Sequence, residues 1–207
     1  MRCKKFYDAK LAAAVLAVLL HSSRILAQGL LVDQASGTTD ELIQNSTRIP
    51  DNQIAQSFTP SLSAVGFVQF SESVPAFPGN DQVTFVVNLR AGAYNGPILS
   101  STDPVILVNH GTQIGTFYYP ANISVTPGQL YFFEPVLLSA GSMDIGYKFP
   151  SSYPGGEAWN NGVPSGGASD YWFREGIVVP EPGAVWLFLF GGAVLLWRWR
   201  VERRSEL

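Results

Sequence analysis

A group of aromatic and amide side chains in the second half of the chain has the chemistry of a sugar site. Tyr153, Trp159, Asn160 and Asn161 lie in the segment 150–170, which is long for a loop in a compact β domain. Carbohydrate recognition needs a flat ring that stacks on a sugar and amides that donate and accept hydrogen bonds beside it. The alternative is that Trp159 packs against the end of the domain. The sequence predicts a sugar contact here and leaves the packing role of Trp159 open.

Acidic side chains supply a second candidate chemistry. Asp33, Asp40, Glu41 and Asp51 gather in one stretch of the chain, without the spacing of an EF-hand. Loop aspartates can bind a calcium ion, and two carboxylates can hydrolyse a glycosidic bond when their separation in space is right. The sequence does not identify such a pair. We therefore expect no catalytic residue, no metal and no cofactor, and keep calcium binding and a secreted carboxylate-dependent glycoside hydrolase as alternatives.

His110 is the only histidine between residues 28 and 207. A histidine-based catalytic triad would have to use it. It lies in Asn109-His110-Gly111-Thr112, a turn sequence between the β-rich runs 105–108 and 113–119. This setting predicts a hairpin with a solvent-exposed histidine at its turn.

The first 27 residues resemble a targeting segment rather than part of the folded domain. Basic residues precede the uninterrupted apolar run Leu11–Leu20, which is half the roughly 20 residues that a spanning helix needs. A basic start followed by a short apolar run is typical of a secretory signal peptide. We expect signal peptidase to cleave after Ala27, and Cys3 to leave with the peptide. An uncleaved anchor is the alternative.

Residues 179–207 form a second targeting segment. Val179-Pro180-Glu181-Pro182 opens a tail in which the prolines favour an extended, accessible linker. An uncharged run follows from residue 183 to residue 197. Beyond it stand four arginines, Arg198, Arg200, Arg203 and Arg204. Arginines on that side of an apolar helix, here about residues 183–201, place the C-terminus in the cytoplasm by the positive-inside rule.

This three-part tail resembles the PEP-CTERM sorting signal, whose last part is also labelled an ice-binding protein C-terminal domain. The resemblance rests on Pro180-Glu181-Pro182, the short apolar helix and the arginine cluster. It implies recognition by an exosortase, a membrane-embedded enzyme, with cleavage near the motif and release or attachment at the cell surface. An ordinary membrane anchor is the alternative, in which case the chain is a simple membrane-anchored structural protein.

Charge and cysteine content restrict the possible functions of the segment between the two targeting segments. Residues 28–179 contain four basic and twelve acidic residues, and no cysteine. This acidic charge balance argues against nucleic-acid binding, because neutralising phosphates needs clustered Lys and Arg. Without cysteine, an exported domain has no disulfides, no thiol nucleophile and no cysteine-ligated zinc site.

The central segment has the pattern of an all-β domain. It holds 17 Gly and 12 Pro, with no apolar period of 3.6 residues sustained over three turns. The clearest strand is Val83–Arg90, in which apolar residues alternate with polar ones. The run Leu130–Leu138 is another, and its Pro135 favours an edge strand or a bulge. About eight such runs, at roughly ten-residue spacing, predict a two-sheet sandwich of jelly-roll type.

Parts of this centre also resemble a β-sandwich unit found in PEP-CTERM proteins, through Gln56-Ser57-Phe58, Pro127–Phe133 and Asp170–Arg174. We therefore expect three parts: a signal peptide (1–27), a β-sandwich domain (28–178) and a sorting signal (179–207). The expected function is that of a non-enzymatic protein, anchored in the inner membrane as a precursor and then placed at the cell surface or outside the cell. There it would contact exopolysaccharide.

Overall fold

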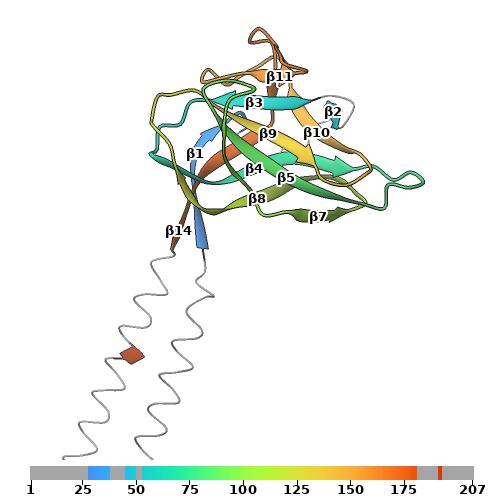
Figure 1. The fold of residues 1–207 in the computed structure, drawn as a ribbon, viewed down its shortest axis with the longest axis horizontal. Coiled ribbons are helices and arrows are strands. Elements are labelled where there is room, and N and C mark those ends of the chain that lie inside the picture. The colour runs from blue at the N-terminus through green and yellow to red at the C-terminus, as the bar shows by residue number, and fades with distance from the viewer. Residues whose placement is uncertain (1–27, 38–44, 50–52, 181–190, 193–207) are drawn as a thin grey trace, which may run out of the picture. The chain divides into compact units, whose positions relative to one another are not determined.

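The computed structural model describes residues 28–37, 45–49, 53–180 and 191–192 (Figure 1). The strands in chain order are β1 (Gln28–Ala35), β2 (Ser46–Ile49), β3 (Ile54–Phe58), β4 (Ala64–Val74), β5 (Gln82–Ala91), β6 (Ile98–Ser101), β7 (Val105–Val108), β8 (His110–Ser124), β9 (Tyr131–Leu137), β10 (Met143–Lys148), β11 (Ala158–Asn160), β12 (Val163–Pro164), β13 (Asp170–Tyr171) and β14 (Phe173–Pro180). The predicted signal peptide, including Ala27, lies outside the described residues. So does most of the predicted C-terminal helix, of which Gly191 and Gly192 are described and are helical. Within the described residues, no helix has the length and apolarity to span a bilayer.

The strands form two sheets of seven strands each. The first sheet has the order β1-β14-β4-β10-β13, with β2 paired to β10 and β8 paired to β4. The second sheet has the order β12-β11-β3-β9-β5-β6, with β7 also paired to β5. The long pairings, β4 with β8 and β5 with β9, are antiparallel. The prediction of an all-β fold with two antiparallel sheets is confirmed, whereas the jelly-roll connectivity stays a prediction.

Aromatic rings from both sheets meet in one core. Phe58 and Phe133 of the second sheet are stacked, with their ring centroids 4.0 Å apart and their planes at 5°. Phe70 of the first sheet meets Phe133 edge-on at 6.4 Å, and Phe173 packs on the same ring at 6.0 Å. All four side chains are fully buried. Burial of large rings on both inner faces is what holds the two sheets together.

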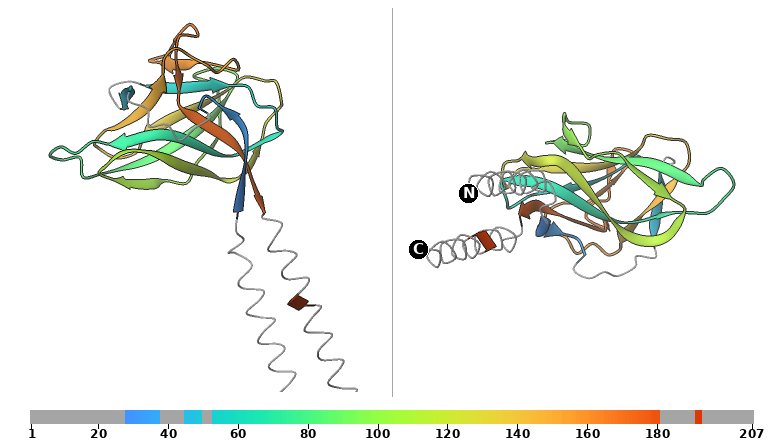
Figure 2. Two further views of the ribbon diagram at one scale, coloured as in Figure 1. Left: turned by 180° about the vertical axis from the view of Figure 1, so that it is seen from behind. Right: turned by 90° about the horizontal axis from the view of Figure 1, so that it is seen from below.

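Residues 30–178 form one compact unit. Its first and last strands, β1 and β14, are hydrogen-bonded neighbours. Figures 1 and 2 show β1 and β14 side by side, as their pairing in the first sheet requires.

The predicted hairpin around His110 is wrong. β7 pairs with β5 in the second sheet, whereas β8 pairs with β4 in the first sheet. The chain passes from one sheet to the other at Asn109, whose backbone N–H donates to the carbonyl of Asp81 at 3.0 Å. Gly111 does not adopt the positive φ that a tight hairpin turn would require there.

The prediction that Pro135 marks an edge strand or a bulge is also wrong. β9 lies between β3 and β5, and Pro135 is in register with Val87 of β5. The Val87 N–H donates to Thr102 Oγ1, and the Val87 carbonyl accepts from the Thr102 N–H. The pair of Val87 with Pro135 therefore requires no hydrogen bond from the proline nitrogen. On the other side, the register with β3 ends at Phe133. Proline is tolerated because its position requires no N–H.

Candidate functional site

The outer face of the second sheet carries polar side chains near its β11 end. In β5, Val87 and Leu89 point into the core and are fully buried, so Asn88 and Arg90 point to the opposite face. The register of β5 and β9 places Asn88 opposite Glu134 and Arg90 opposite Phe132. Together with Tyr94 and Trp159, described below, Asn88, Arg90 and Glu134 form what we call the sheet-two face.

The polar residues of the sheet-two face are linked by short hydrogen bonds. Glu134 Oε2 accepts from Arg90 Nε at 2.8 Å and from Asn88 Nδ2 at 2.8 Å. Ser101 Oγ donates to Asn88 Oδ1 at 2.6 Å, and Arg90 Nη1 donates to the carbonyl of Gly96 at 2.7 Å. The Arg90 and Glu134 side chains are 19% and 16% exposed. The network therefore fixes the orientation of an amide, a guanidinium and a carboxylate that still reach solvent.

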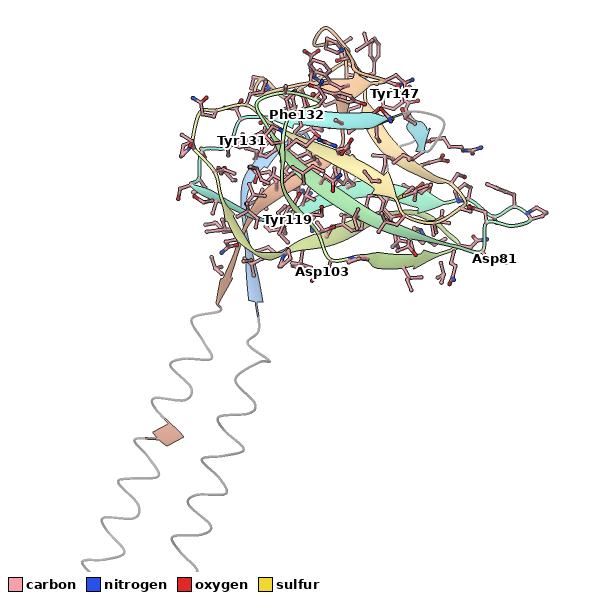
Figure 3. The ribbon with its side chains drawn as sticks, in the orientation of Figure 1. Asp81, Asp103, Tyr119, Tyr131, Phe132 and Tyr147 are labelled. Carbon is pink, nitrogen blue, oxygen red and sulfur yellow. The ribbon has the colours of Figure 1, made fainter. Side chains whose placement is uncertain are left out.

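An aromatic pair borders this network. The ring of Trp159, on β11, stacks with the ring of Tyr94 from the loop between β5 and β6, at 5.8 Å and 16°. Phe132 of β9, which is labelled in Figure 3, meets Trp159 edge-on at 5.4 Å. Both Trp159 and Tyr94 are half-buried, and the Trp159 Nε1 donor has no hydrogen-bond partner among the described residues. Trp159 thus packs on the sheet, and its half-buried ring also contributes to the surface, whereas its contact with sugar stays a prediction.

Burial and the nearby charge of Glu134 raise the pKa of the Tyr94 phenol. The phenol therefore stays neutral at physiological pH. Its hydroxyl donates to the backbone carbonyl of Gln53 at 3.2 Å. Tyr94 consequently offers a fixed, uncharged ring to the surface.

A tight hairpin holds Trp159 in place. β11 and β12 pair with Trp159 opposite Pro164 and Asn160 opposite Val163, which leaves Asn161 and Gly162 as the turn. Both turn residues have positive φ, 51° and 77°, as an Asn-Gly hairpin turn requires. Asn161 also anchors the hairpin to β3, because its Oδ1 accepts from the Gln53 N–H at 2.9 Å and its own N–H donates to the Gln53 carbonyl at 2.7 Å.

The other predicted sugar-contact residues are separated by the fold. Asn160 is exposed beside Trp159. Tyr153 is 6% exposed and lies in the core, where its ring meets Phe173 edge-on at 5.1 Å. Its hydroxyl accepts from the Thr59 N–H at 3.2 Å. Tyr153 therefore presents no ring face to solvent and is not part of the sheet-two face.

His110 is half-buried at the start of β8, so the predicted solvent-exposed turn position is wrong. Its Nε2 lies 3.2 Å from Oε2 of Glu72, and Gln113 donates to Oε1 of the same carboxyl group at 3.0 Å. Burial raises the pKa of Glu72, and the contacts with Gln113 and His110 offset part of that rise. Glu72 is 1% exposed, which keeps its carboxyl group away from any external glycosidic bond.

Most of the remaining sequence-predicted residues lie outside the described part of the chain. These are Asp40, Glu41 and Asp51 of the acidic group, Glu181 and Pro182 of the sorting motif, and the cluster Arg198, Arg200, Arg203 and Arg204. Val179 and Pro180 are described, and they end strand β14 instead of opening a linker. Asp33 is also described, on β1.

No protein-family model matches the chain, and no curated protein matches it. Among solved structures, the chain is similar to CsCBM6-3 from Clostridium stercorarium, determined in complex with cellobiose, at 13% identity over 58% of this chain and 89% of that one, with a TM-score of 0.29. It is also similar to the CBM36-1 domain of a multidomain xylanase from the hindgut metagenome of Trinervitermes trinervoides, at 16% identity over 57% and 96% of the two chains, with a TM-score of 0.18. A third match is to the infectious bursal disease virus Gx strain, at 11% identity over 75% and 31% of the chains, with a TM-score of 0.22. At these scores the likenesses carry no conclusion about ligand or activity.

Proposed function

We propose that this chain is an exported, non-enzymatic protein that contacts polysaccharide through the sheet-two face of a jelly-roll-like sandwich. The observation that carries the proposal is the Tyr94–Trp159 pair, held on the sheet beside the Asn88–Glu134–Arg90 network. A neutral, fixed ring beside amide and charged hydrogen-bonding groups suits the alternating apolar and hydroxyl surfaces of a sugar. Fixing these side chains in advance lowers the entropy lost on binding.

The glycoside hydrolase alternative is less well supported, because the carboxyl groups of Glu72 and Glu175 are 1% and 0% exposed. Glu134, which does reach the surface, is held by Arg90 and Asn88.

Replacing Trp159 by alanine is expected to weaken binding of the exopolysaccharide purified from the producing cells by about tenfold, or about 1.4 kcal/mol, since stacking would be lost. Tyr94→Ala should weaken it by a similar factor. Affinity electrophoresis of the exported protein in gels containing that polysaccharide would measure both effects. Tyr118→Ala is the matched control, because Tyr118 is a 43% exposed tyrosine on β8 of the other sheet. Equal binding by all four proteins would refute the proposed face.

We further propose that the tail is an exosortase substrate, so that the mature protein lacks both the signal peptide and the C-terminal tail. Intact-mass analysis of the protein isolated from its host is expected to give a chain that begins near residue 28 and ends near Pro180-Glu181-Pro182. Loss of the tail should require the exosortase, and a strain without it should accumulate the membrane-bound precursor. A mass from the wild-type host that retains residues 183–207 would defeat the sorting proposal and favour a simple membrane anchor.

A further inference from the structure

The charged side chains of the domain are divided unevenly between its two sheets. Among the described strands of the second sheet, Arg90 is the only basic residue and Glu134 the only acidic one. The other basic residues between positions 28 and 179 are Arg48, Lys148 and Arg174, which lie on β2, β10 and β14 of the first sheet. The sheet-two face therefore has a single cation with which to meet a ligand.

That cation is already balanced by a carboxylate of the protein. Arg90 Nε donates to Glu134 Oε2 at 2.8 Å, and Arg90 Nη1 donates to the Gly96 carbonyl at 2.7 Å. An arginine is a common partner for the carboxylate of a ligand, but here two of its three nitrogens already have acceptors in the protein. A ligand carboxylate would have to displace Glu134 or lie against its negative charge. The face therefore disfavours anionic groups.

Glu134 instead suits a ligand that carries hydroxyl groups. Both hydrogen bonds that the described residues donate to Glu134 end on Oε2, which leaves Oε1 as an acceptor for a ligand. Because the Glu134 side chain is 16% exposed, this oxygen can be reached from solvent. A sugar hydroxyl that donates to a carboxylate makes a charge-assisted hydrogen bond, whereas an ionised ligand carboxylate has no hydrogen to donate.

The charge of the whole domain acts in the same direction. Residues 28–179 contain twelve acidic and four basic residues. Glu157 directly precedes β11, the strand that carries Trp159, so it adds an acidic group near the aromatic pair. A negative domain lowers the local concentration of a polyanion and slows its approach.

We infer that the sheet-two face selects a neutral polysaccharide, and that the Arg90–Glu134 pair excludes chains that carry carboxylates, such as those of uronic acids. This inference rests on the proposed function of the face and adds the chemical class of its ligand. The aromatic pair supplies stacking, which neutral and acidic sugars share, whereas the charge pair supplies the discrimination. Binding of the neutral chain is expected to change less than about twofold between about 50 and about 500 mM NaCl.

The test separates the exopolysaccharide of the producing cells into neutral and acidic fractions by anion exchange. Affinity electrophoresis of the exported protein is expected to show retardation by the neutral fraction alone. EDTA is present throughout, so that divalent cations cannot bridge the carboxylates of the protein and the polysaccharide. Oxidising the primary hydroxyls of the neutral fraction to carboxylates should weaken its binding by at least about fivefold, because it adds negative charge to the same backbone.

Trp159→Ala separates failure of this inference from failure of the proposed function. If the acidic fraction retards the wild type and Trp159→Ala abolishes that retardation, neutral selection is overturned while the face itself stands. If neither fraction retards the wild type, or if Trp159→Ala has no effect with either fraction, the face is refuted as a polysaccharide contact.

Glu134→Gln gives a positive test of the charge pair. Glutamine keeps the size of the side chain and an oxygen acceptor for Arg90 but removes the balancing charge, so binding of the acidic fraction should increase by about threefold. Asp144→Asn is the matched control, since it removes the same charge from the Arg48–Asp144 ion pair, 3.1 Å long, on the first sheet. It should produce no increase. An equal increase in both variants, or none in Glu134→Gln, would overturn the role of the Arg90–Glu134 pair.

Discussion

Replacing Glu175 by glutamine is expected to raise the free energy of unfolding by about 3 kcal/mol at pH 7, at about 1.4 kcal/mol per pKa unit. Burial first, and the charge and hydrogen-bonding contact of Asp33 next, raise the pKa of Glu175 from 4.5 to about 9. The folded protein must therefore hold a proton that the unfolded chain has released at pH 7. Glutamine mimics the protonated group and removes this cost.

The pH dependence gives the sign of the effect. Below about pH 4.5 Glu175 is protonated in both states, so the wild type and Glu175→Gln should be equally stable. Between pH 4.5 and about 9 the wild type should lose stability relative to the variant, because its folded state alone keeps the proton. Above that range the difference should level off. Urea unfolding at pH 4.5, 7 and 9 measures it, with Asp103→Asn, at an exposed carboxylate, as the control. A difference that does not change with pH would contradict the account.

Phe133→Ala is expected to destabilise the domain by about 3–5 kcal/mol, which is a large part of the roughly 5–15 kcal/mol that holds a typical domain folded. Phe133 is fully buried, stacks on Phe58 and contacts Phe70 and Phe173, so its ring links both sheets. Removing it leaves a cavity that the rigid sheets cannot close. Equilibrium denaturation would measure the loss. The control, Phe149→Ala, removes a ring that is 68% exposed and should change stability by less than about 0.5 kcal/mol. A loss below about 1 kcal/mol for Phe133→Ala would show that the two sheets do not depend on this ring.

The elements of the fold were predictable where local pattern determines them. The alternation in Val83–Arg90 predicts a strand with one buried face, and β5 has that geometry. The partners of each strand were not predictable in the same way. The turn sequence at Asn109–Thr112 favours a local hairpin, but β7 and β8 pair with β5 and β4 in different sheets. Long-range pairing overrode the local signal. It also places Pro135 in a central strand, at a position beyond the end of the pairing with β3, where no N–H donor is required.

The candidate site was predictable only in part, for the same reason. Trp159 could be identified because it lies beside two amides in a long segment, and the Asn161-Gly162 pair is a hairpin signal in the sequence itself. Tyr94, Arg90 and Glu134 carry no local signal, because register across β5 and β9 and the folding back of the Tyr94 loop bring them together. Tyr153 resembled a surface aromatic in sequence, but its ring fills the space against Phe173.

The neighbouring acids Asp33 and Glu175 show the same limit more clearly. Asp33 and Glu175 are far apart in sequence, and pairing of β1 with β14 makes them neighbours. Their separation in the chain gives no hint of this contact. The signal peptide and the sorting signal, by contrast, are predicted from local composition. They stay predictions because nearly all of their residues lie outside the described part of the chain.

Hydroxyl-radical footprinting of the exported protein, with and without the exopolysaccharide of the producing cells, tests the central claim most directly. Side chains covered by a bound polysaccharide lose solvent contact and are oxidised more slowly. We expect reduced oxidation of Tyr94 and Trp159 in the complex, with unchanged oxidation of Tyr118 and Phe149, which are 43% and 68% exposed elsewhere on the domain. Protection of Tyr118 or Phe149 without protection of Tyr94 and Trp159 would contradict the assignment of the sheet-two face as the polysaccharide contact.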